Sequence, residues 1–573
     1  MIKKLAGCFK KYKVFALLTP LFVIGEVFLE VFIPLLMADI IDIGIKNKDI
    51  NFILITGLTM VGMAFLSLVC GAVAGRLGAL SATGFAKNVR QKMYYSIQNY
   101  SFSNIDRFST ASLITRITTD VTITQDTLQL ALRALIRAPI MLITATTMAF
   151  SINNELALIF LIVIPFLGTV FALIMVKAFP KFLKLFKKYD KMNSVIQENL
   201  IGIRTVKSYV REGHEIEKFQ EASKDIMSFA KKAERIVILN MPAMQFAIFA
   251  CMLAIAWFGG NKIIAGSMTE GQLTSFLSYV MQILMSLMMI SVIFINMVMT
   301  KAAASRIVEV MDEAPEIKDP KNPEKEIKDG TIEFRDVNFS YNKNDNFVLK
   351  DINFKIEHGQ TIGLIGGTGS AKSSLVQLIP RLYDTTEGTV LVGGLDVKNY
   401  HLKTLRDSVG IVLQKNVLFS GTIEENLRWG DENATMDDII AAAKIAQAHN
   451  FIMSFPDGYN TNLDQGGVNL SGGQRQRICI ARAILKKPKV LIFDDSTSAV
   501  DTKTDASIRK ALKTDLSDVT KIIIAQRIAS IEDADQIIIL DDGQIKGMGK
   551  HNELINTNEI YREVYTSQKN MGE

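Results

Sequence analysis

The sequence predicts two fold classes in one chain: an all-α transmembrane domain over residues 1–311 and an α/β domain over residues 331–573, joined by a linker at 312–330. Three observations support this division. The length of 573 residues exceeds that of one ordinary domain. Long apolar stretches crowd the first part, whereas short apolar runs alternate with helical patterns in the second. A segment rich in proline and charge, Asp312–Asp329, separates the two patterns.

The composition indicates a membrane protein. Hydrophobic residues make up 49% of the chain, and the formal charge is 64 − 58 = +6. Because the lysines cluster beside apolar spans, they indicate a lipid bilayer as the partner, and a nucleic acid is not required. The four cysteines, Cys8, Cys70, Cys251 and Cys479, lack metal-ligand spacing and are expected to be single buried thiols.

Six apolar stretches are long enough to cross a hydrocarbon layer of about 30 Å. They are Val14–Ile45, Phe52–Ala74, Ala138–Ile152 with its flanks, Ala157–Val176, Ile236–Phe258 and Leu273–Thr300. No cleavable signal is evident, because the apolar run after the basic N-terminus is too long for a signal core.

The distribution of basic residues predicts the orientation of these spans. Lysines gather before the first span and after the fourth, at positions 3, 4, 10, 11 and 13 and at positions 177, 181, 184, 187, 188 and 191. The loops around Lys46–Asn51 and Ser151–Glu155 are short and are placed outside. The positive-inside rule then puts both termini, and the second domain, in the cytoplasm.

Two long intervals separate the second span from the third and the fourth from the fifth. Both keep a helical apolar period, and neither contains proline between Arg76 and Arg137 or between Lys181 and Asn240. A disordered loop does not explain such a period. We therefore expect each interval to be a helix that leaves the membrane, a turn, and a helix that returns, with turns near 101–110 and 199–205.

The second domain shows the alternation of strands and helices that is typical of an α/β fold. The predicted strands are Thr331–Phe334, Thr361–Ile365, Gly410–Leu413, Val490–Phe493, Lys521–Ala525 and Gln536–Leu540.

A phosphate-binding loop follows the strand Thr361–Ile365. Glycines let backbone N–H groups point inward, and the N-terminus of the following helix favours anionic phosphate. Lys372 is expected to reach the β- and γ-phosphates of a nucleotide, and Ser373 to ligate Mg²⁺. Ala371 replaces the second glycine; if this position needs φ > 0, the change costs about 1 kcal/mol. The predicted nucleotide-binding residues here are Gly366, Gly367, Thr368, Gly369, Ser370, Ala371, Lys372, Ser373 and Ser374.

Two adjacent carboxylates end the apolar strand Val490–Phe493. Asp494 is expected to hold Mg²⁺ near the phosphates. The next position would orient the attacking water, and Asp495 is one methylene shorter than the glutamate expected there. A misplacement of about 1 Å can reduce the rate by roughly 10²-fold.

With these motifs in place, the whole chain resembles the ATP-binding-cassette (ABC) exporters. Leu470-Ser471-Gly472-Gly473-Gln474 resembles the intact family signature. Gln414 resembles the Q-loop glutamine, which contacts Mg²⁺, and Tyr341 the aromatic residue that stacks on adenine. The segment Ser498-Ala499-Val500-Asp501 resembles the D-loop, and Gln526 stands where the switch histidine is expected. The segments 104–116 and 198–210 resemble the two coupling segments.

The resemblance implies ATP and Mg²⁺ as cofactors, and Asp495, Gln526 and Gln414 as the catalytic group. Family cassettes work head to tail, so each ATP lies between one subunit's phosphate loop and the other subunit's signature. Asp495 and Gln526 affect the same reaction centre, with Ala371 nearby. The sequence therefore predicts a site that hydrolyses ATP slowly and a heterodimeric bacterial multidrug-type exporter whose partner supplies the glutamate and the histidine.

Two features of the spans bear on the cargo. Glu26 and Glu30 lie one helical turn apart in the first span. They form a negative patch for cationic amphiphiles, pair with an arginine such as Arg133 or Arg137, or lie near an aqueous entrance. The methionines at 281, 285, 288 and 289 form a stripe that suits either a broad pocket for small amphiphilic substrates or ordinary packing. A homodimeric lipid or peptide exporter and a nucleotide-gated regulatory subunit remain the alternatives.

Overall fold

The computed structural model describes residues 2–341, 346–496 and 500–570. The chain forms two compact units. The first comprises Met1–Gln98 and Ser109–Glu313, and the second comprises Asn99–Phe108 and Ala314–Glu573. The first cytoplasmic turn predicted from the sequence thus groups with the C-terminal unit. Each unit is described by itself.

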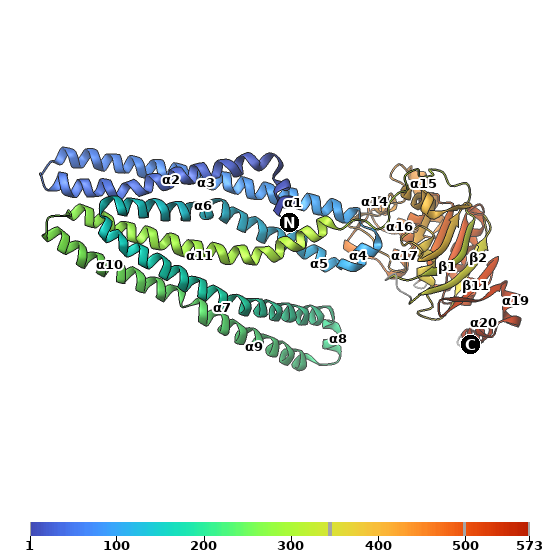
Figure 1. The fold of residues 1–573 in the computed structure, drawn as a ribbon. Helices are drawn as coiled ribbons and strands as arrows, with labels where there is room; N and C mark the ends of the chain where they lie inside the picture. Colours follow the sequence, from blue (N-terminus) through green and yellow to red (C-terminus); the bar gives the residue numbers. More distant parts are fainter. Residues whose placement is uncertain (1, 342–345, 497–499, 571–573) are drawn as a thin grey trace. The chain divides into compact units, whose positions relative to one another are not determined.

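Long helices build the first unit (Figure 1). Six are long and apolar enough to cross a membrane, which confirms the predicted spans. The helices are α1 Ile2–Ala6, α2 Lys13–Asp39, α3 Ile50–Gln98, α5 Thr110–Thr115, α6 Val121–Ile152, α7 Asn154–Ile201, α8 Ile203–Ser208, α9 Glu212–Val237, α10 Asn240–Ile264 and α11 Glu270–Asp312.

Several of these helices are too long for the bilayer alone. Helix α3 has 49 residues and α7 has 48, which at about 1.5 Å per residue gives each roughly 70 Å. Helix α3 ends at Gln98, and α4 (Phe102–Phe108) forms the first turn. Gly202 separates α7 from α8 at the second turn. Both positions confirm the excursions predicted from the spacing of the spans.

The core of the membrane unit lies between α2, α6, α7, α10 and α11. Phe160 of α7 stacks on Phe276 of α11, with ring centroids 5.4 Å apart. Tyr279 is fully buried, and its hydroxyl donates to the Val31 carbonyl at 2.7 Å. This hydrogen bond satisfies a polar group that would be costly to leave unpaired in an apolar core.

Two sheets build the C-terminal unit. The larger has the order β12-β11-β3-β10-β9-β6 and is parallel except for β12, and the smaller is antiparallel with the order β2-β1-β4-β5. The strands are β1 Ile332–Phe339, β2 Leu349–Ile356, β3 Thr361–Ile365, β4 Glu387–Val392, β5 Leu395–Asp396, β6 Val409–Val412, β7 Gly421–Thr422, β8 Asn462–Leu463, β9 Val490–Asp494, β10 Thr520–Ile524, β11 Gln536–Asp541 and β12 Gln544–Gly549.

All six strands predicted from the sequence are present, and each sheet is packed against an apolar core. The helices of this unit are α12 Lys372–Leu378, α13 Leu402–Ser408, α14 Ile423–Leu427, α15 Met436–Ile445, α16 His449–Met453, α17 Gly472–Leu485, α18 Thr502–Asp515, α19 His551–Thr557 and α20 Glu559–Asn570, together with α4. The all-α unit followed by an α/β unit confirms the predicted fold class.

An ion pair joins the extramembrane ends of α6 and α11. Asp120 is 1% exposed, and its two carboxylate oxygens accept hydrogen bonds from Arg306 at 2.7 and 2.5 Å. Arg306 is half-exposed. The geometry is bidentate, which fixes both side chains.

We expect Arg306→Met to destabilise the membrane unit, because the substitution leaves the Asp120 carboxylate buried without its partner. The expected loss is about 2 kcal/mol, less than for a fully buried pair because Arg306 itself is half-exposed. The thermal unfolding midpoint of the purified chain in detergent measures this loss. Asp120→Asn combined with Arg306→Met removes both charges and should recover most of it. An unchanged midpoint in Arg306→Met would contradict the prediction.

Candidate nucleotide site

One edge of the larger sheet gathers the predicted site residues. Strand β10 lies between β3 and β9, and Ile524 pairs with both Leu364 and Asp494. The loops that follow these three parallel strands therefore start at the same level. Strand β6 pairs with β9, with Val412 opposite Phe493, which brings the segment of Gln414 to the same edge. Ligands of open α/β sheets bind at this carboxyl edge.

The loop between β3 and α12 has the backbone of an anion cradle. Gly366 lies so close to β11 that a Cβ there would come within 2.0 Å of the Leu540 carbonyl oxygen. Gly369 has φ of +85°. No larger residue fits the first position, and the second favours glycine. The conformation leaves backbone N–H groups available to phosphate oxygens.

Ala371 adopts the left-handed conformation, with φ 71° and ψ 22°. The sequence prediction made strain depend on φ > 0 at this position, and the structure meets that condition. The Cβ of Ala371 packs at the border of the apolar core around β3. The loop therefore keeps its shape although Ala371 stands where a second glycine is expected.

Lys372 and Ser373 face the polar end of the loop. The Lys372 ammonium donates to the carbonyls of Gly366 and Gly367 at 2.9 and 2.8 Å, and to Ser370. Burial lowers the pKa of Lys372, whereas the carboxylates of Asp495 and Asp494 raise it. The Ser373 hydroxyl donates to Asp494 at 2.9 Å. Ser373 and Asp494 thus place two hard oxygen ligands side by side, as Mg²⁺ requires.

Asp494 and Asp495 differ sharply in environment. Asp494 is 3% exposed at the end of β9, and burial raises the pKa of its carboxyl, partly opposed by the Ser373 hydrogen bond. Asp495 follows in a left-handed conformation, with φ 49°. Its backbone N–H donates to the Ile524 carbonyl at 3.2 Å, which ties it to the strand that precedes the switch position.

The three predicted catalytic residues lie together. Gln526 donates its side-chain amide to the Asp495 carboxylate at 2.6 Å. Gln414 approaches the same oxygen at 3.5 Å. An amide donor carries no charge and does not titrate, so it holds the carboxylate without acting as an acid or a base.

Tyr341 lies at the edge of an aromatic cluster. Its ring is 44% exposed, and its hydroxyl is 2.8 Å from that of Ser374. Phe339 and Tyr383 pack edge-on against it, with centroids 4.8 and 5.1 Å away. The exposed face suits stacking on a nucleobase.

The signature residues occupy the start of a separate helix. Ser471 caps α17, and Gln474 completes the capping box by accepting from the Ser471 N–H at 2.9 Å. Ser471 and Gly472 are exposed. Among the described residues no hydrogen bond or ion pair joins Ser471, Gly472, Gly473 or Gln474 to the phosphate loop.

The predicted D-loop is described in part. Ser498 and Ala499 lie outside the described residues. Val500 is buried, and Asp501 caps α18 by accepting from the Thr504 N–H at 2.9 Å. This hydrogen bond, and the positive charge of Arg477, lower the pKa of the Asp501 carboxyl.

Two residues that sequence reasoning missed hold the edges of the site. Tyr383 donates to Asp106 of α4 at 2.6 Å, and its ring is 6.1 Å from that of Phe102. Burial and Asp106 both raise the pKa of the Tyr383 hydroxyl, so it remains protonated and donates. Gln568 of α20 donates to the Gln526 carbonyl at 2.7 Å and accepts from the Ile528 N–H at 2.9 Å. Both contacts join segments far apart in sequence, and no local pattern signals them.

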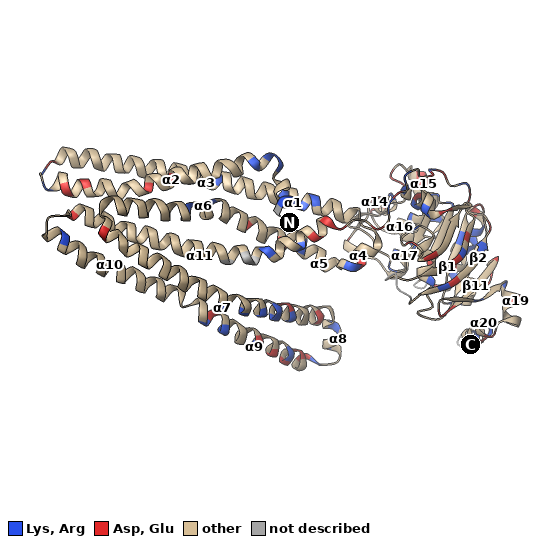
Figure 2. Cartoon of the chain, viewed as in Figure 1, with Lys and Arg blue, Asp and Glu red and all other residues tan. Residues whose placement is uncertain are grey.

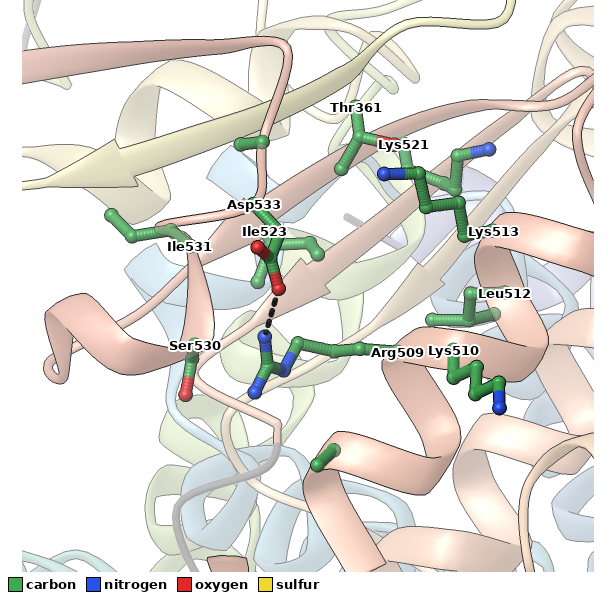
Figure 3. A pocket seen from close by; sticks show the side chains of 12 residues that line it. Thr361, Arg509, Lys510, Leu512, Lys513, Lys521, Ile523, Ser530, Ile531 and Asp533 are labelled. Carbon is green, nitrogen blue, oxygen red and sulfur yellow. Dashed lines mark hydrogen bonds and ion pairs between the residues drawn. The ribbon is translucent and has the colours of Figure 1, made fainter. Parts of the chain in front are cut away.

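Another cavity, of about 310 Å³, lies between α18 and residues of β3 and β10 (Figure 3). It is lined by Thr361 of β3, by Lys521 and Ile523 of β10, and by basic residues of α18. Arg509 there bonds to Asp505 at 3.3 Å and to Asp533 at 3.4 Å. None of the residues that line it is a predicted nucleotide-site residue, so this cavity is not part of the nucleotide site.

The membrane unit has a charged cavity of its own, of about 520 Å³, lined in part by Glu26, Arg133 and Arg137. Arg137 donates to Glu26 and, at 2.6 Å, to Glu30. This pairing is one of the arrangements the sequence allowed, and the partner is Arg137 and not Arg133. Arg133 instead lies against α3, where Cβ atoms at Gly75 and Gly78 would be 3.6 and 3.7 Å away.

In the methionine stripe Met281, Met285 and Met289 are exposed, whereas Met288 packs on the core.

Known proteins match both units. The family described as "ABC transporter transmembrane region" matches residues 16–287, and the family described as "ABC transporter" matches residues 349–498. The uncharacterized ABC transporter ATP-binding protein YfiB of Bacillus subtilis (strain 168) is 36% identical over 99% of this chain and 98% of its own length.

Two further relatives extend the comparison. The ATP-dependent lipid A-core flippase of Desulfotalea psychrophila is 31% identical, with 93% of each chain covered. A solved structure, that of a bacterial Atm1-family ABC exporter with ATP bound, superposes with a TM-score of 0.83 at 24% identity and covers 98% of both chains. That structure shows the fold.

Ala371→Gly should stabilise the C-terminal unit, because glycine adopts φ 71° without a Cβ clash. We expect a gain of about 1 kcal/mol, measured by urea unfolding through the fluorescence of Trp429. Ala441→Gly is the matched control, because Ala441 is exposed inside α15 and the same change there should destabilise by about 1 kcal/mol. A loss of stability in Ala371→Gly would contradict the prediction.

Tyr383→Phe should uncouple α4 from the aromatic cluster, because it removes the donor to Asp106. In a double-mutant cycle with Asp106→Ala we expect a coupling energy of about 1.5 kcal/mol, as for a hydrogen bond to a charged group. The same unfolding measurement applies. Tyr400→Phe, which removes a hydroxyl that donates to the Val392 carbonyl at 2.8 Å, should show no coupling to Asp106→Ala. Equal coupling energies for both tyrosines would contradict a specific hydrogen bond from Tyr383 to Asp106.

Proposed function

The chain belongs to the ATP-binding-cassette transporters, as an exporter half-transporter with one transmembrane and one nucleotide-binding domain, and from that premise we propose that it is the degenerate-site subunit of a heterodimer. ATP-driven export across the membrane is the activity of the family. The observation that carries the proposal is the pairing of Asp495 with Gln526.

The arrangement of the described residues supports nucleotide binding at this site. The loop backbone and Lys372 would hold the phosphates, and the exposed ring of Tyr341 would stack on adenine. Ser373, Asp494 and Gln414 would hold Mg²⁺, which neutralises charge on the β- and γ-phosphates. Strain at Ala371 lies in the backbone and leaves these groups in place.

The same geometry argues against fast hydrolysis at this site. The Asp495 side chain is one methylene shorter than a glutamate, and its carboxylate is held by the Gln526 amide at 2.6 Å. A carboxylate on the shorter side chain would lie farther from the attacking water than a glutamate would, and a misplacement of about 1 Å can reduce the rate by roughly 10²-fold. Gln526 replaces a residue that can carry charge with one that cannot.

A partner subunit would complete the machine. Ser471 and Gly472 are exposed at the N-terminus of α17, where backbone N–H groups favour a phosphate brought by another chain. The second cytoplasmic turn also exposes apolar side chains: Ile201 at 79%, Tyr209 at 75% and Val210 at 80%. Such a surface favours a protein contact. The partner should contain the catalytic glutamate and the switch histidine, and its own signature can be the altered one.

The membrane cavity favours amphiphilic cargo. Its apolar and charged side chains, including Met289, Glu26 and Arg133, offer both kinds of contact. We place the transporter in the bacterial plasma membrane with both termini in the cytoplasm, on the lysine distribution. The relative named as a lipid A-core flippase favours a lipid exporter as the alternative.

The decisive test uses the co-expressed pair in which the partner's glutamate is changed to Gln, so that hydrolysis at the partner's site is silenced. In this background Asp495→Glu with Gln526→His should raise the remaining ATPase rate by about 10²-fold. Asp495→Asn should change it little.

The intact pair provides the opposing arm. Asp495→Asn should leave most of the ATPase activity and of the substrate uptake into inverted vesicles, whereas the partner's Glu→Gln should remove both. Equal damage from the two substitutions would refute the degenerate site. Robust ATPase activity of this chain purified alone would instead support a homodimer.

A further inference from the structure

A crevice of about 520 Å³ opens between α7 and the junction of α9 with α10. Helix α7 contributes one face of side chains at i, i+3, i+4 and i+7: Val170, Leu173, Ile174 and Lys177. The other wall is formed by Ile236, Leu239, Pro242 and Ala243. Apart from Lys177, every lining residue is apolar.

A break in the helix shapes the second wall. Helix α9 ends at Val237 and α10 begins at Asn240. Pro242 lacks the N–H that would bond to the carbonyl four residues earlier, and its ring disfavours a continuous helix. The break lies at the edge of the predicted span Ile236–Phe258. The crevice is therefore at the boundary of the membrane.

The wall is not covered by the chain itself. Leu173 is 55% exposed and Leu239 is 54% exposed. At the level of the bilayer such leucines meet lipid chains or another membrane helix rather than water, and the excess of cations on the flanking segments favours an anionic lipid over an apolar helix face. An acyl chain is thus the chemical group that fits the crevice.

Cations are in excess on the two segments that form the crevice. Helix α7 carries Lys177, Lys181 and Lys184, and α9 carries Lys231, Lys232 and Arg235, whereas Glu234 is the one acid of both stretches, 170–184 and 228–245. The net charge of the two stretches is 6 − 1 = +5. Lys177 lines the crevice itself, and Lys232 lies over the Phe229 ring at 5.2 Å. Among the described residues none of these six cations has an ion pair.

The lysines farther along α7 are different. Lys188 pairs with Asp225 at 2.5 Å. Figure 2 shows basic and acidic residues mixed on α9 toward α8. Lys191 lies about 21 Å from Lys177 along the helix axis at 1.5 Å per residue, which exceeds the Debye length of about 8 Å. Relative to the crevice, the lysines from position 187 onward are therefore either paired, as Lys188 is, or screened by distance.

We propose that this crevice binds an anionic phospholipid of the cytoplasmic leaflet. One acyl chain lies against Leu173 and Leu239, and the headgroup phosphate lies between Lys177 and Lys181 of α7 and Arg235 of α9. The placement in that leaflet rests on the proposed orientation of the spans. Basic side chains beside the surface of an anionic leaflet favour such a lipid over a zwitterionic one.

Lipid binding to the purified full-length chain tests the proposal. Native mass spectrometry in detergent, without nucleotide, compares phosphatidylglycerol with phosphatidylcholine. We expect phosphatidylglycerol to bind about tenfold more tightly or better. Lys177→Gln with Lys181→Gln should abolish this preference and leave phosphatidylcholine unchanged.

A matched control is available on the same helix. Lys187→Gln with Lys191→Gln removes two lysines at the same spacing of four, and each lies ten residues farther from the membrane than its counterpart. It should keep the preference for phosphatidylglycerol. If it lowers binding as much as the first pair, the attraction is diffuse and the site is refuted.

The acyl chain requires its own variant. Ala243→Phe fills the crevice and should weaken both lipids, as a seated chain demands. Unchanged binding in Ala243→Phe, or equal affinity of the two lipids for the unmodified chain, would overturn the proposal. These measurements involve neither ATP nor the partner subunit. Their outcome therefore does not depend on whether the chain forms a heterodimer. Thiol labelling of a single cysteine at position 184 in right-side-out and inverted vesicles checks the orientation.

Discussion

The parallel pairing of β3, β10 and β9 is the constraint on which the nucleotide site depends. It sets Leu364, Ile524 and Asp494 at one level, so the loops that follow must meet. Main-chain bonds extend the pairing by one residue: Ala525 donates to Leu364 and Asp495 to Ile524, both at 3.2 Å. A slip of one residue in β10 would turn its side chains to the opposite face and separate Gln526 from Asp495.

If the site is degenerate, as proposed, this constraint explains how the chain keeps the geometry of the site. The left-handed conformation at residue 371 is imposed by a loop fixed at both ends, so alanine accepts it at a modest cost. At 495 and 526 the backbone brings the two side chains together whatever they are. On the proposed function, substitution there alters the chemistry of hydrolysis and leaves the fold and the binding of a nucleotide in place. Binding and hydrolysis would then be separable properties of this sheet edge.

The sequence predicts what local pattern controls. The six spans and the six predicted strands are mainly apolar runs, and all are present. The strands β2 and β12 were not predicted because their polar residues alternate with apolar ones, as in Leu349–Ile356. Strand β4 was not predicted because its apolar run is short. Sequence analysis did not predict the contacts of Tyr383 with Asp106 and of Gln568 with Gln526, because they join distant segments. For Glu26 the sequence offered Arg133 and Arg137, and only the direction of the side chains in three dimensions decides between them.

Charged and polar groups of this chain fall into two classes, those with a partner in the chain and those without one. Where charged or polar groups find partners within the chain, as Asp120 does with Arg306 and Glu26 with Arg137, they fix the helices. Where the chain supplies no partner, at the start of α17 and around the crevice beside α7, the groups stay at the surface in patterns that suit a phosphate group. A half-transporter must leave such groups for other molecules, because each of its ligands is shared with a partner or with the bilayer. On the two proposals, the exposed start of α17 is where a partner subunit's nucleotide would bind, and the cations beside α7 are where an anionic lipid would bind.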